Sequence, residues 1–336
     1  APTAYSKVLL ACIASAVALV FYILSCLRAG ELRLRLSLGL TVLWGIALIS
    51  AIATLFSGDM FDAFIGDTFS VQTTAFAILL AVTASVVTIL RESKTQIIRL
   101  YSLITLSALL LGVFHIVRAV FGFESFTLGS FTAATASPLG PWNDVALFFG
   151  LVILLALVAV EQLPLTRWGQ LVLTGTVGVS LILLAVINFF SVWLVLGIVS
   201  LVLLVYGLMK PRFISNSLGF DESAPGSSTA IVLSASVFIV AILFLIGGSA
   251  AGNWINSATG ITYVEVRPSF SATMDIARDV YAENAFVGIG PNKFIDAWRL
   301  YKDPAINQTV FWDTSFSTGS GYIPTVSIET GLFGLL

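Results

Sequence analysis

The sequence predicts an all-α, polytopic membrane protein: a helical bundle of about eight or nine transmembrane helices that carries one large extracytoplasmic loop. Of the 336 residues, 58% are hydrophobic and only 10% are charged, whereas soluble domains carry about 25% charged residues. The mean hydropathy of +1.01 is too high for a protein whose whole surface meets water. No basic tail or patch indicates nucleic acid, and the apolar richness argues against disorder over most of the chain.

The transmembrane helices are predicted from runs of roughly 20 apolar residues, the length that crosses a bilayer. Eight runs qualify: 8–27, 36–56, 73–90, 97–121, 145–160, 171–190, 192–209 and 230–247. Asn188 and Ser191 mark the break between the sixth and seventh runs, which predicts a tight re-entry. A ninth run begins near Ile323.

Three parts follow from this distribution: a transmembrane helical bundle over 1–248, an extracytoplasmic loop domain over 249–322, and the start of a further transmembrane helix over 323–336. The chain begins at Ala1 and ends within an apolar run. We therefore expect it to be a piece of a longer protein with further terminal helices.

The orientation is predicted from the placement of Lys and Arg, which favour cytoplasmic connections. Basic residues follow the first, third, fifth and seventh runs: Arg28, Arg33, Arg35, Arg91, Lys94, Arg99, Arg167, Lys210 and Arg212. The alternate connections, 57–72, 123–144 and 188–191, contain no Lys or Arg. The first set is therefore predicted to be cytoplasmic, and the long loop is predicted to lie outside.

The loop 249–322 is the stretch with the composition of a soluble protein. An amphipathic helix is predicted over 269–284, with Phe270, Met274, Ala277 and Tyr281 on one face. Residues 288–292 predict a turn, and Pro291 favours a second short helix after it. We expect the loop to be ordered.

Two ionisable residues lie inside a predicted span, where charge is costly and often functional. His115 and Arg118 are three residues apart, hence on one helix face, near the outer end of the fourth run. They are candidates for binding a phosphate group. Alternatively, Arg118 extends to the membrane interface and His115 is a hydrogen-bonded packing residue.

Three further candidates lie at the same predicted surface. Asn143 and Asp144 precede the fifth run and offer an amide and a carboxylate to a substrate, or they cap the helix. Arg267 lies where the loop helix is predicted to begin, a position that suits a pyrophosphate. The alternative for Arg267 is a salt bridge. Arg118, Asn143 and Arg267 are predicted to line one outer-facing cavity.

No metal or cofactor is predicted. His115 is the single histidine, and both cysteines lie in the first apolar run, so neither a zinc nor an iron–sulfur site is expected. The turn at 288–292 has no strand before it and no Gly-Lys-Ser/Thr after it, which excludes a nucleotide-binding fingerprint.

Five stretches carry a resemblance: 57–66 (Ser-Gly-Asp through Phe-Ile-Gly), Trp142-Asn143-Asp144 with Ala146, Arg267 with Ala272 and Ile276, 286–294 (Phe-Val-Gly-Ile-Gly-Pro-Asn-Lys-Phe) and 329–336 (Glu-Thr-Gly-Leu-Phe-Gly-Leu-Leu). In this order they resemble the O-antigen ligase/polymerase superfamily, a polytopic group with a glycosyltransferase-C-like architecture. Residues 311–314 and 322–325 add a likeness to a branch found in uncultivated small-genome bacteria.

The resemblance implies transfer of a glycan from a polyprenyl-pyrophosphate carrier to an acceptor on the outer face of a bacterial plasma (inner) membrane. It implies no metal or nucleotide cofactor. Arginines, here Arg267 and Arg118, would neutralise the pyrophosphate, and a loop histidine would activate the acceptor.

The sequence departs from the superfamily at the positions that carry chemistry. The His-Asn pair falls on Ser320-Gly321, 67–74 contains no arginine, and a Ser-Arg pair is replaced by Ser191-Val192. Any base is therefore predicted to be a carboxylate, Asp313 or Glu329, with His115 as the other candidate. Asp313 would need burial to raise its pKa, which its aromatic neighbours favour; alternatively it caps a turn.

Two other functions are kept beside glycan transfer. The chain could be a non-catalytic relative that serves as a membrane assembly or glycan-binding subunit. It could also be a transporter or flippase, although these typically show internal repeats and broken helices at the midplane, and the sequence shows no internal repeat.

Overall fold

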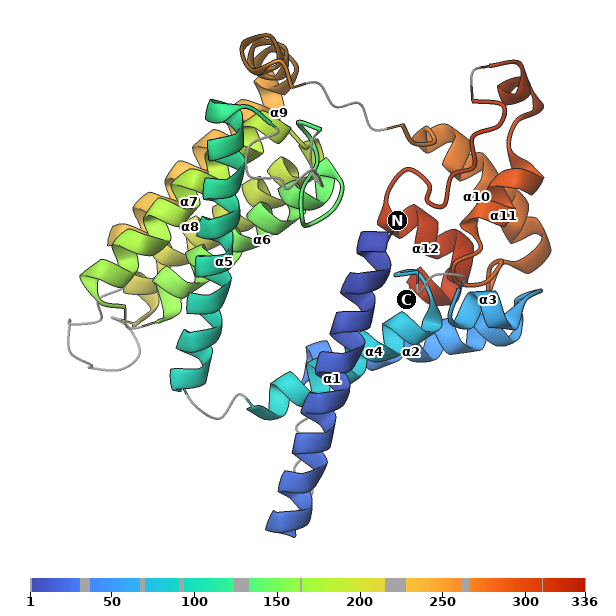
Figure 1. Cartoon of the computed structure of the whole chain (residues 1–336), viewed down its shortest axis with the longest axis horizontal. Coiled ribbons are helices and arrows are strands. Elements are labelled where there is room, and N and C mark those ends of the chain that lie inside the picture. The colour runs from blue at the N-terminus through green and yellow to red at the C-terminus, as the bar shows by residue number, and fades with distance from the viewer. Residues whose placement is uncertain are drawn as a thin grey trace. The chain divides into compact units, whose positions relative to one another are not determined.

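The prediction of an all-α polytopic membrane protein is confirmed by the computed structural model (Figure 1). The structure describes residues 2–30, 37–66, 70–90, 94–123, 133–163, 165–214, 228–261, 266–309 and 311–335. Within these ranges every named element is a helix.

Seven of the helices are long and apolar enough to cross a membrane: α1 (Pro2–Ala29), α2 (Leu38–Leu55), α5 (Lys94–Phe121), α6 (Trp142–Gln162), α7 (Arg167–Ile187), α8 (Phe190–Ile214) and α9 (Ser228–Thr259). The predicted third run forms α4 (Thr74–Leu90), an apolar helix of 17 residues. At 1.5 Å per residue it is a few ångströms short of a bilayer core of about 30 Å. By length and composition the described residues therefore provide seven spans, where eight or nine were predicted.

The chain forms two compact units. The first unit joins Ala1–Ser93 to Glu265–Leu336, and the second is Lys94–Val264. The first four helices thus group with the segment from 265 onward. The parts predicted from the sequence had their boundaries after residues 248 and 322.

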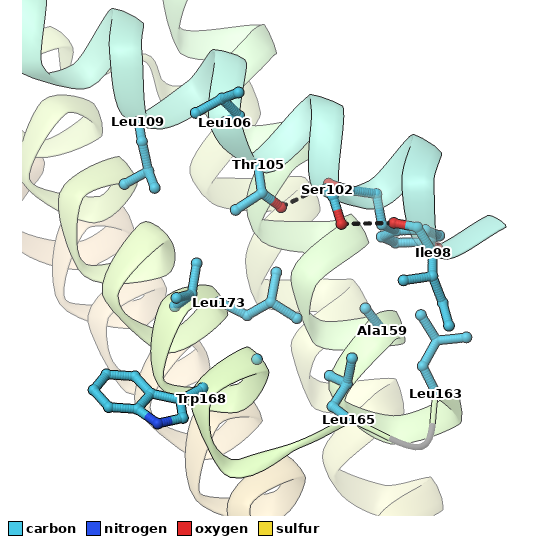
Figure 2. Close-up of a pocket in the computed structure, with 13 residues that line it drawn as sticks. Ile98, Ser102, Thr105, Leu106, Leu109, Ala159, Leu163, Leu165, Trp168 and Leu173 are labelled. Carbon is cyan, nitrogen blue, oxygen red and sulfur yellow. Dashed lines mark hydrogen bonds between the residues drawn. The ribbon is translucent and has the colours of Figure 1, made fainter. Parts of the chain in front are cut away.

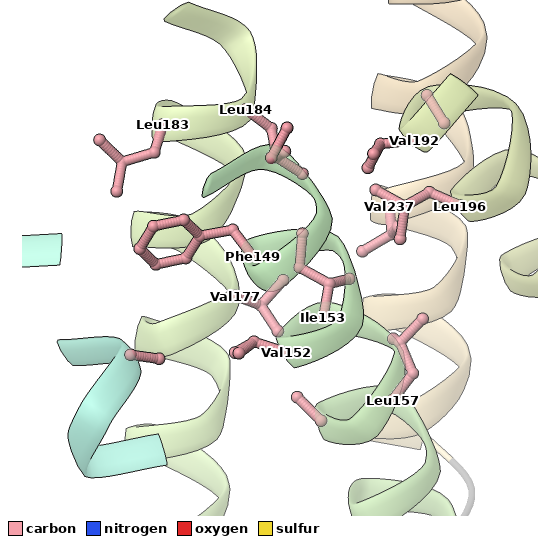
Figure 3. Packing of buried hydrophobic residues seen from close by; sticks show 14 of the residues in the cluster. Phe149, Val152, Ile153, Leu157, Val177, Leu183, Leu184, Val192, Leu196 and Val237 are labelled. Carbon is pink, nitrogen blue, oxygen red and sulfur yellow. The ribbon is translucent and has the colours of Figure 1, made fainter. Parts of the chain in front are cut away.

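In the second unit, α5 to α9 lie side by side, and α6 is the most buried of the seven long helices (Figure 1). Phe149 and Ile153 of α6 are fully buried among Val177 of α7 and Leu196 of α8 (Figure 3). Because there is no water to exclude from helix interfaces in lipid, van der Waals packing of such side chains holds the helices together.

A sharp turn joins α7 to α8, as predicted from Asn188. The backbone of Asn188 is left-handed, with φ 51°, and its side-chain Nδ2 donates to the carbonyl oxygen of Gly248 on α9 at 2.6 Å. Asparagine suits both tasks because it tolerates this conformation better than most residues. Ser191, the other predicted breaker, lies inside α8.

The first unit contains the remaining helices: α3 (Met60–Phe64), α10 (Phe270–Asn284), α11 (Phe294–Tyr301), α12 (Tyr322–Thr330), and the 3-10 turns η1 (Pro304–Gln308) and η2 (Leu332–Leu335). Here α1 and α2 pack on α4, and α12 packs on α10 and α2. The helix predicted over 269–284 is confirmed as α10, and the second short helix is confirmed as α11.

The predicted face of α10 is confirmed in part. Thr273, Ile276, Ala277 and Val280 are buried, whereas Phe270 is exposed. Ala277 lies on the predicted face, and the half-buried Met274 and Tyr281 also pack against these buried residues, so the prediction is wrong for Phe270 alone. Residues 322–330, predicted to begin a further span, form the nine-residue α12, which ends at Gly331.

Candidate functional site

A candidate site lies in the first unit, where the turn after α10 meets the end of α12. The two backbones pair directly: the N–H of Ile289 donates to the carbonyl of Ile328 at 3.1 Å, and the N–H of Gly290 donates to that of Glu329 at 2.8 Å. On the far side of the crossing, the N–H of Leu332 donates to the carbonyl of Ala285 at 2.9 Å.

Two glycines allow this close crossing. Gly288 and Gly331 both have φ of +65°, and a Cβ on Gly288 would lie 2.3 Å from the carbonyl oxygen of Ile328. A Cβ on Gly331 would lie 2.4 Å from the carbonyl oxygen of Phe286. Any side chain at these positions is thus excluded by both contact and backbone conformation.

Glu329 is buried beneath this turn and is 3% exposed. Its Oε1 accepts a hydrogen bond from the backbone N–H of Phe294 at 3.3 Å. Phe294 is the first residue of α11, and the cap residue Lys293 makes no side-chain capping bond. Glu329 therefore supplies from α12 the acceptor that a helix N-terminus needs.

Burial raises the pKa of the Glu329 carboxyl from 4.5 to about 8, although hydrogen bonds from the backbone N–H groups of Phe294 and Asn292 oppose the rise. Burial wins because desolvation penalises the charged carboxylate more than two neutral donors repay. A carboxyl that titrates near neutrality is typical of groups that move protons.

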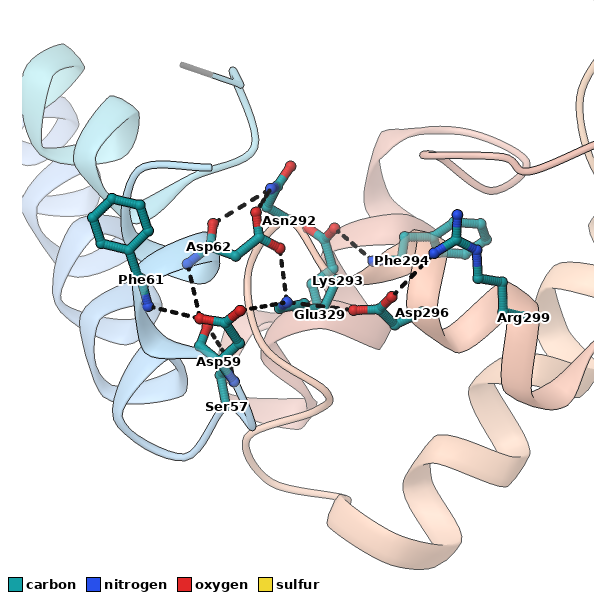
Figure 4. A network of polar contacts seen from close by, with 10 residues as sticks. All are labelled: Ser57, Asp59, Phe61, Asp62, Asn292, Lys293, Phe294, Asp296, Arg299 and Glu329. Carbon is teal, nitrogen blue, oxygen red and sulfur yellow. Dashed lines mark hydrogen bonds and ion pairs between the residues drawn. The ribbon is translucent and has the colours of Figure 1, made fainter. Parts of the chain in front are cut away.

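Lys293 lies at the centre of a network of carboxylates, which we call the Lys293 cluster: Lys293, Asp59, Asp62 and Asp296 (Figure 4). Its Nζ lies 2.7 Å from Asp62, 3.4 Å from Asp296 and 3.9 Å from Asp59. The lysine side chain is 10% exposed, while that of Asp62 is 22% exposed.

The pKa of Lys293 is raised above its ordinary value. Burial alone would lower it, but the hydrogen bond and charge of Asp62, together with Asp296, outweigh the burial. The ammonium is therefore fixed in its charged form by carboxylates already present.

The Lys293 cluster also joins the 57–66 segment to the glycine turn. Asp59 caps α3 by accepting from the N–H groups of Phe61 and Asp62 at 3.1 and 3.2 Å. The amide of Asn292, a residue with φ of 61°, donates to the backbone carbonyl and side chain of Asp62, both at 3.4 Å. A Cβ on Gly290 would lie 2.6 Å from that of Ser57.

A cavity of about 450 Å³ opens beside this network. It is lined by Gly58, Asp59, Ile289, Lys293, Asp296, Arg299 and Leu300. The two cations, Lys293 and Arg299, face Asp59 and Asp296, and Asp62 lies behind, so the surrounding charge does not favour an anion. Within the described ranges no group of three or more His, Cys, Asp or Glu side chains is placed to hold a metal ion.

The structure places the predicted intramembrane pair, His115 and Arg118, in the second unit. Arg118 is 1% exposed, and its guanidinium donates to the carbonyls of Phe123, Ala136 and Ala133 at 2.9, 2.7 and 2.8 Å. The side chain thus reaches the connection after α5 and holds it, and binding of a phosphate group by Arg118 stays a prediction.

His115 is also buried, with Nε2 3.3 Å from the hydroxyl of Ser137 and its ring edge-on to Trp142. These contacts account for its burial without a ligand.

Neither Asn143 nor Asp144 caps α6, so that alternative is wrong. The cap residue is Pro141, whose side chain makes no capping bond, and Asn143 and Asp144 lie within the first turn. Asp144 is an exposed residue of the first turn, where its charge complements the helix dipole. Binding of a substrate by either residue stays a prediction.

Arg267 is exposed and precedes α10, which begins with Ser269 as its cap. It belongs to the first unit, whereas Arg118 and Asn143 belong to the second. The outer-facing cavity predicted between these three residues therefore stays a prediction.

The predicted burial of Asp313 is wrong. The residue is exposed, and its neighbours Phe311 and Trp312 also face outward. The turn is instead anchored by Trp298, whose indole N–H donates to the carbonyl of Thr314 at 3.0 Å. Of the two predicted catalytic carboxylates, Glu329 is the one in a desolvated environment.

Sequence reasoning missed the Lys293 cluster. The available signals were the spacing of Asp59 with Asp62 and of Lys293 with Asp296, each three residues apart. That spacing places each pair on one helical turn, but it does not show that two segments more than 200 residues apart meet.

Comparison of the chain with protein-family models, with curated proteins and with solved structures gives no match in any of the three.

Proposed function

We propose that this polytopic membrane protein transfers a glycan from a polyprenyl-pyrophosphate carrier to an acceptor at the outer face of a bacterial plasma membrane. One observation carries the proposal. Three of the five stretches that resemble O-antigen ligases and polymerases meet in the first unit: 57–66 and 329–336 both contact 286–294. Their order along the chain alone does not require this.

In this proposal Arg267 neutralises the leaving pyrophosphate, because an arginine fork pairs with two phosphate oxygens at once. No metal or nucleotide is needed if cations stabilise the leaving group. The acceptor hydroxyl must lose its proton as attack develops.

A catalytic base needs a suitable pKa and access to the acceptor, and each candidate carboxylate has only one of the two. Glu329 has a pKa of about 8 but is 3% exposed. Asp313 is exposed, so it is not in a desolvated environment. We assign the proton transfer to the ionised form of Glu329, the candidate in a desolvated environment.

Because neither carboxylate is both desolvated and exposed, a second function is also a candidate: a non-catalytic relative that binds glycan or assists membrane assembly. In that function Glu329 only caps α11, and Lys293 only joins two segments. A transporter or flippase has no comparable support, since no observation in the described residues indicates a substrate path.

The test is transfer by the purified chain in liposomes that contain an oligosaccharide on polyprenyl pyrophosphate, with product detected by mass spectrometry. A base at Glu329 predicts that Glu329→Gln lowers the rate about 100-fold or more, while Asp313→Asn leaves it unchanged. A Glu329→Gln enzyme as fast as the unaltered protein removes Glu329 as the base. Absence of transfer in the unaltered, full-length protein, with the glycan still bound, favours the non-catalytic relative.

A further inference from the structure

A groove opens in the second unit between the first turns of α5, the end of α6 and the start of α7 (Figure 2). Its volume is about 310 Å³, within the range of about 300–1,000 Å³ that is typical of small-molecule sites. Side chains from all three helices line it, among them Ile98, Tyr101, Leu163, Trp168 and Leu173.

The wall of this groove is suited to hydrocarbon. Two of its hydroxyl side chains on α5 bond to their own helix: Ser102 donates to the carbonyl of Ile98 and Thr105 to that of Tyr101, both at 2.8 Å. Because these two hydroxyl protons are already donated, the lining side chains that remain as donors to a polar ligand are Tyr101 and Trp168. An acyl chain needs none.

The groove lies at the ends of three candidate spans, where the apolar core of a bilayer meets its headgroups. Leu163 directly follows α6, and Trp168 lies in the first turn of α7. Tryptophan at such a boundary is typical of membrane proteins, and Trp168 is 76% exposed.

Basic residues flank this end of the groove. Arg99 precedes Ser102 by three residues, so it extends the edge of α5 that carries Ser102 and Leu106. Arg167 is adjacent to Trp168, and both arginines are exposed. Over 94–109 and 156–173 the sequence has Lys94, Arg99 and Arg167 against the single acidic residue Glu161. An anionic headgroup is therefore favoured.

We propose that this groove binds an anionic phospholipid, with one acyl chain along the wall between α5 and α7 and the phosphate at Arg99 and Arg167. Basic pockets between transmembrane helices bind such headgroups because the anionic leaflet and the arginines attract over a Debye length. The proposal is independent of glycan transfer.

The test uses Trp168 as a reporter. The full chain is placed in phosphatidylcholine nanodiscs that contain increasing amounts of either phosphatidylglycerol or phosphatidylcholine with brominated acyl chains, which quench nearby tryptophan. The Trp168 contribution is the difference between the unaltered protein and Trp168→Phe. We expect half-maximal quenching at a lower fraction of the brominated phosphatidylglycerol.

Three variants sharpen the test. Replacing Arg99 and Arg167 by Gln is expected to remove about fivefold of the preference for each arginine, while replacing both by Lys keeps most of it. Ser102→Phe fills the groove and is expected to weaken quenching by both lipids. Trp44, on α2 in the other unit, is the matched reporter and is expected to be quenched equally by the two lipids.

Equal quenching of Trp168 by the two brominated lipids would show general lipid contact and overturn the proposal. So would a preference for phosphatidylglycerol that survives the Gln variant, or quenching of Trp168 that Ser102→Phe leaves unchanged for both lipids.

Discussion

At the scale of single residues, Lys293 shows how burial and charge oppose one another. Its desolvation is repaid by carboxylates from two segments, 57–66 and 286–296. Removing one partner of a buried pair costs more than the pair contributes, since the other charges stay behind unpaired. Lys293 is thus a sensitive point for the first unit.

We expect Lys293→Met to lower the free energy of unfolding by about 2 kcal/mol, the order of a hydrogen-bonded charge pair, in a denaturant titration of the detergent-solubilised chain. The pKa of Lys293 is raised in the folded state. Its contribution is therefore complete at neutral pH and is lost as the pH rises past about 10.5 and through the folded value. Arg278→Met, on the exposed face of α10, is the control and should change stability by less than about 0.5 kcal/mol. Equal effects of the two variants would contradict this account.

The contribution of Glu329 to stability is expected to change with pH in the opposite direction from that of most acidic residues. Its folded pKa of about 8 exceeds 4.5, so the fold favours the protonated carboxyl. Stability should be greatest below about pH 4.5 and should fall as the pH rises to about 8. Glu329→Gln keeps the capping acceptor without the charge, so thermal unfolding at pH 5, 6.5 and 8 should show a smaller slope than in the unaltered chain. An unchanged slope would assign the pH dependence to other groups.

At the scale of elements, most helices could be predicted because their signals are local. Apolar runs predicted the transmembrane helices, and Asn188 predicted the sharp turn between α7 and α8. The buried face of α10 could be predicted in part, through Ala277 and its neighbours. The exposure of Phe270 could not, because it depends on which residues of α10 meet α11 and α12. The Lys293 cluster and the exposure of Asp313 likewise depend on which distant segments meet, and spacing along the chain does not carry that information.

The crossing of the glycine turn with α12 is predicted to be intolerant of any Cβ. Gly288→Ala would force a methyl group 2.3 Å from the carbonyl of Ile328 at φ +65°, which should cost about 2 kcal/mol or more. We expect limited proteolysis to cut the variant between Ser269 and Trp298 faster than the unaltered chain. Gly58→Ala, where a Cβ would meet nothing within 4 Å, should be cut at the original rate. Resistance of Gly288→Ala to cleavage would show that the turn adjusts.

At the scale of the whole molecule, the charge alternation predicts which ends of the spans face the cytoplasm. The second unit offers a check within itself. The groove between α5, α6 and α7 joins the beginning of α5 to the end of α6 and the beginning of α7. The two basic connections, at Arg99 and Arg167, therefore lie at the same end of these helices. His115, Ser137 and Trp142 meet near the opposite end of α5, where the connection carries no Lys or Arg.

This arrangement leads to a prediction about sidedness. The test uses a chain whose Cys12 and Cys26 are replaced by Ala. A single cysteine at Gln162 should be protected from a membrane-impermeant maleimide in intact spheroplasts, because the connection after α6 carries Arg167 and is predicted to be cytoplasmic. A single cysteine at Asn307, in the predicted extracytoplasmic loop, should react at once. Both residues are exposed in the structure, so burial does not explain a difference, and permeabilised cells should label both. Labelling of Gln162→Cys alone in intact spheroplasts would invert the topology. It would also move the proposed site of glycan transfer to the cytoplasmic face, where its donor would have to be presented before it crosses the membrane.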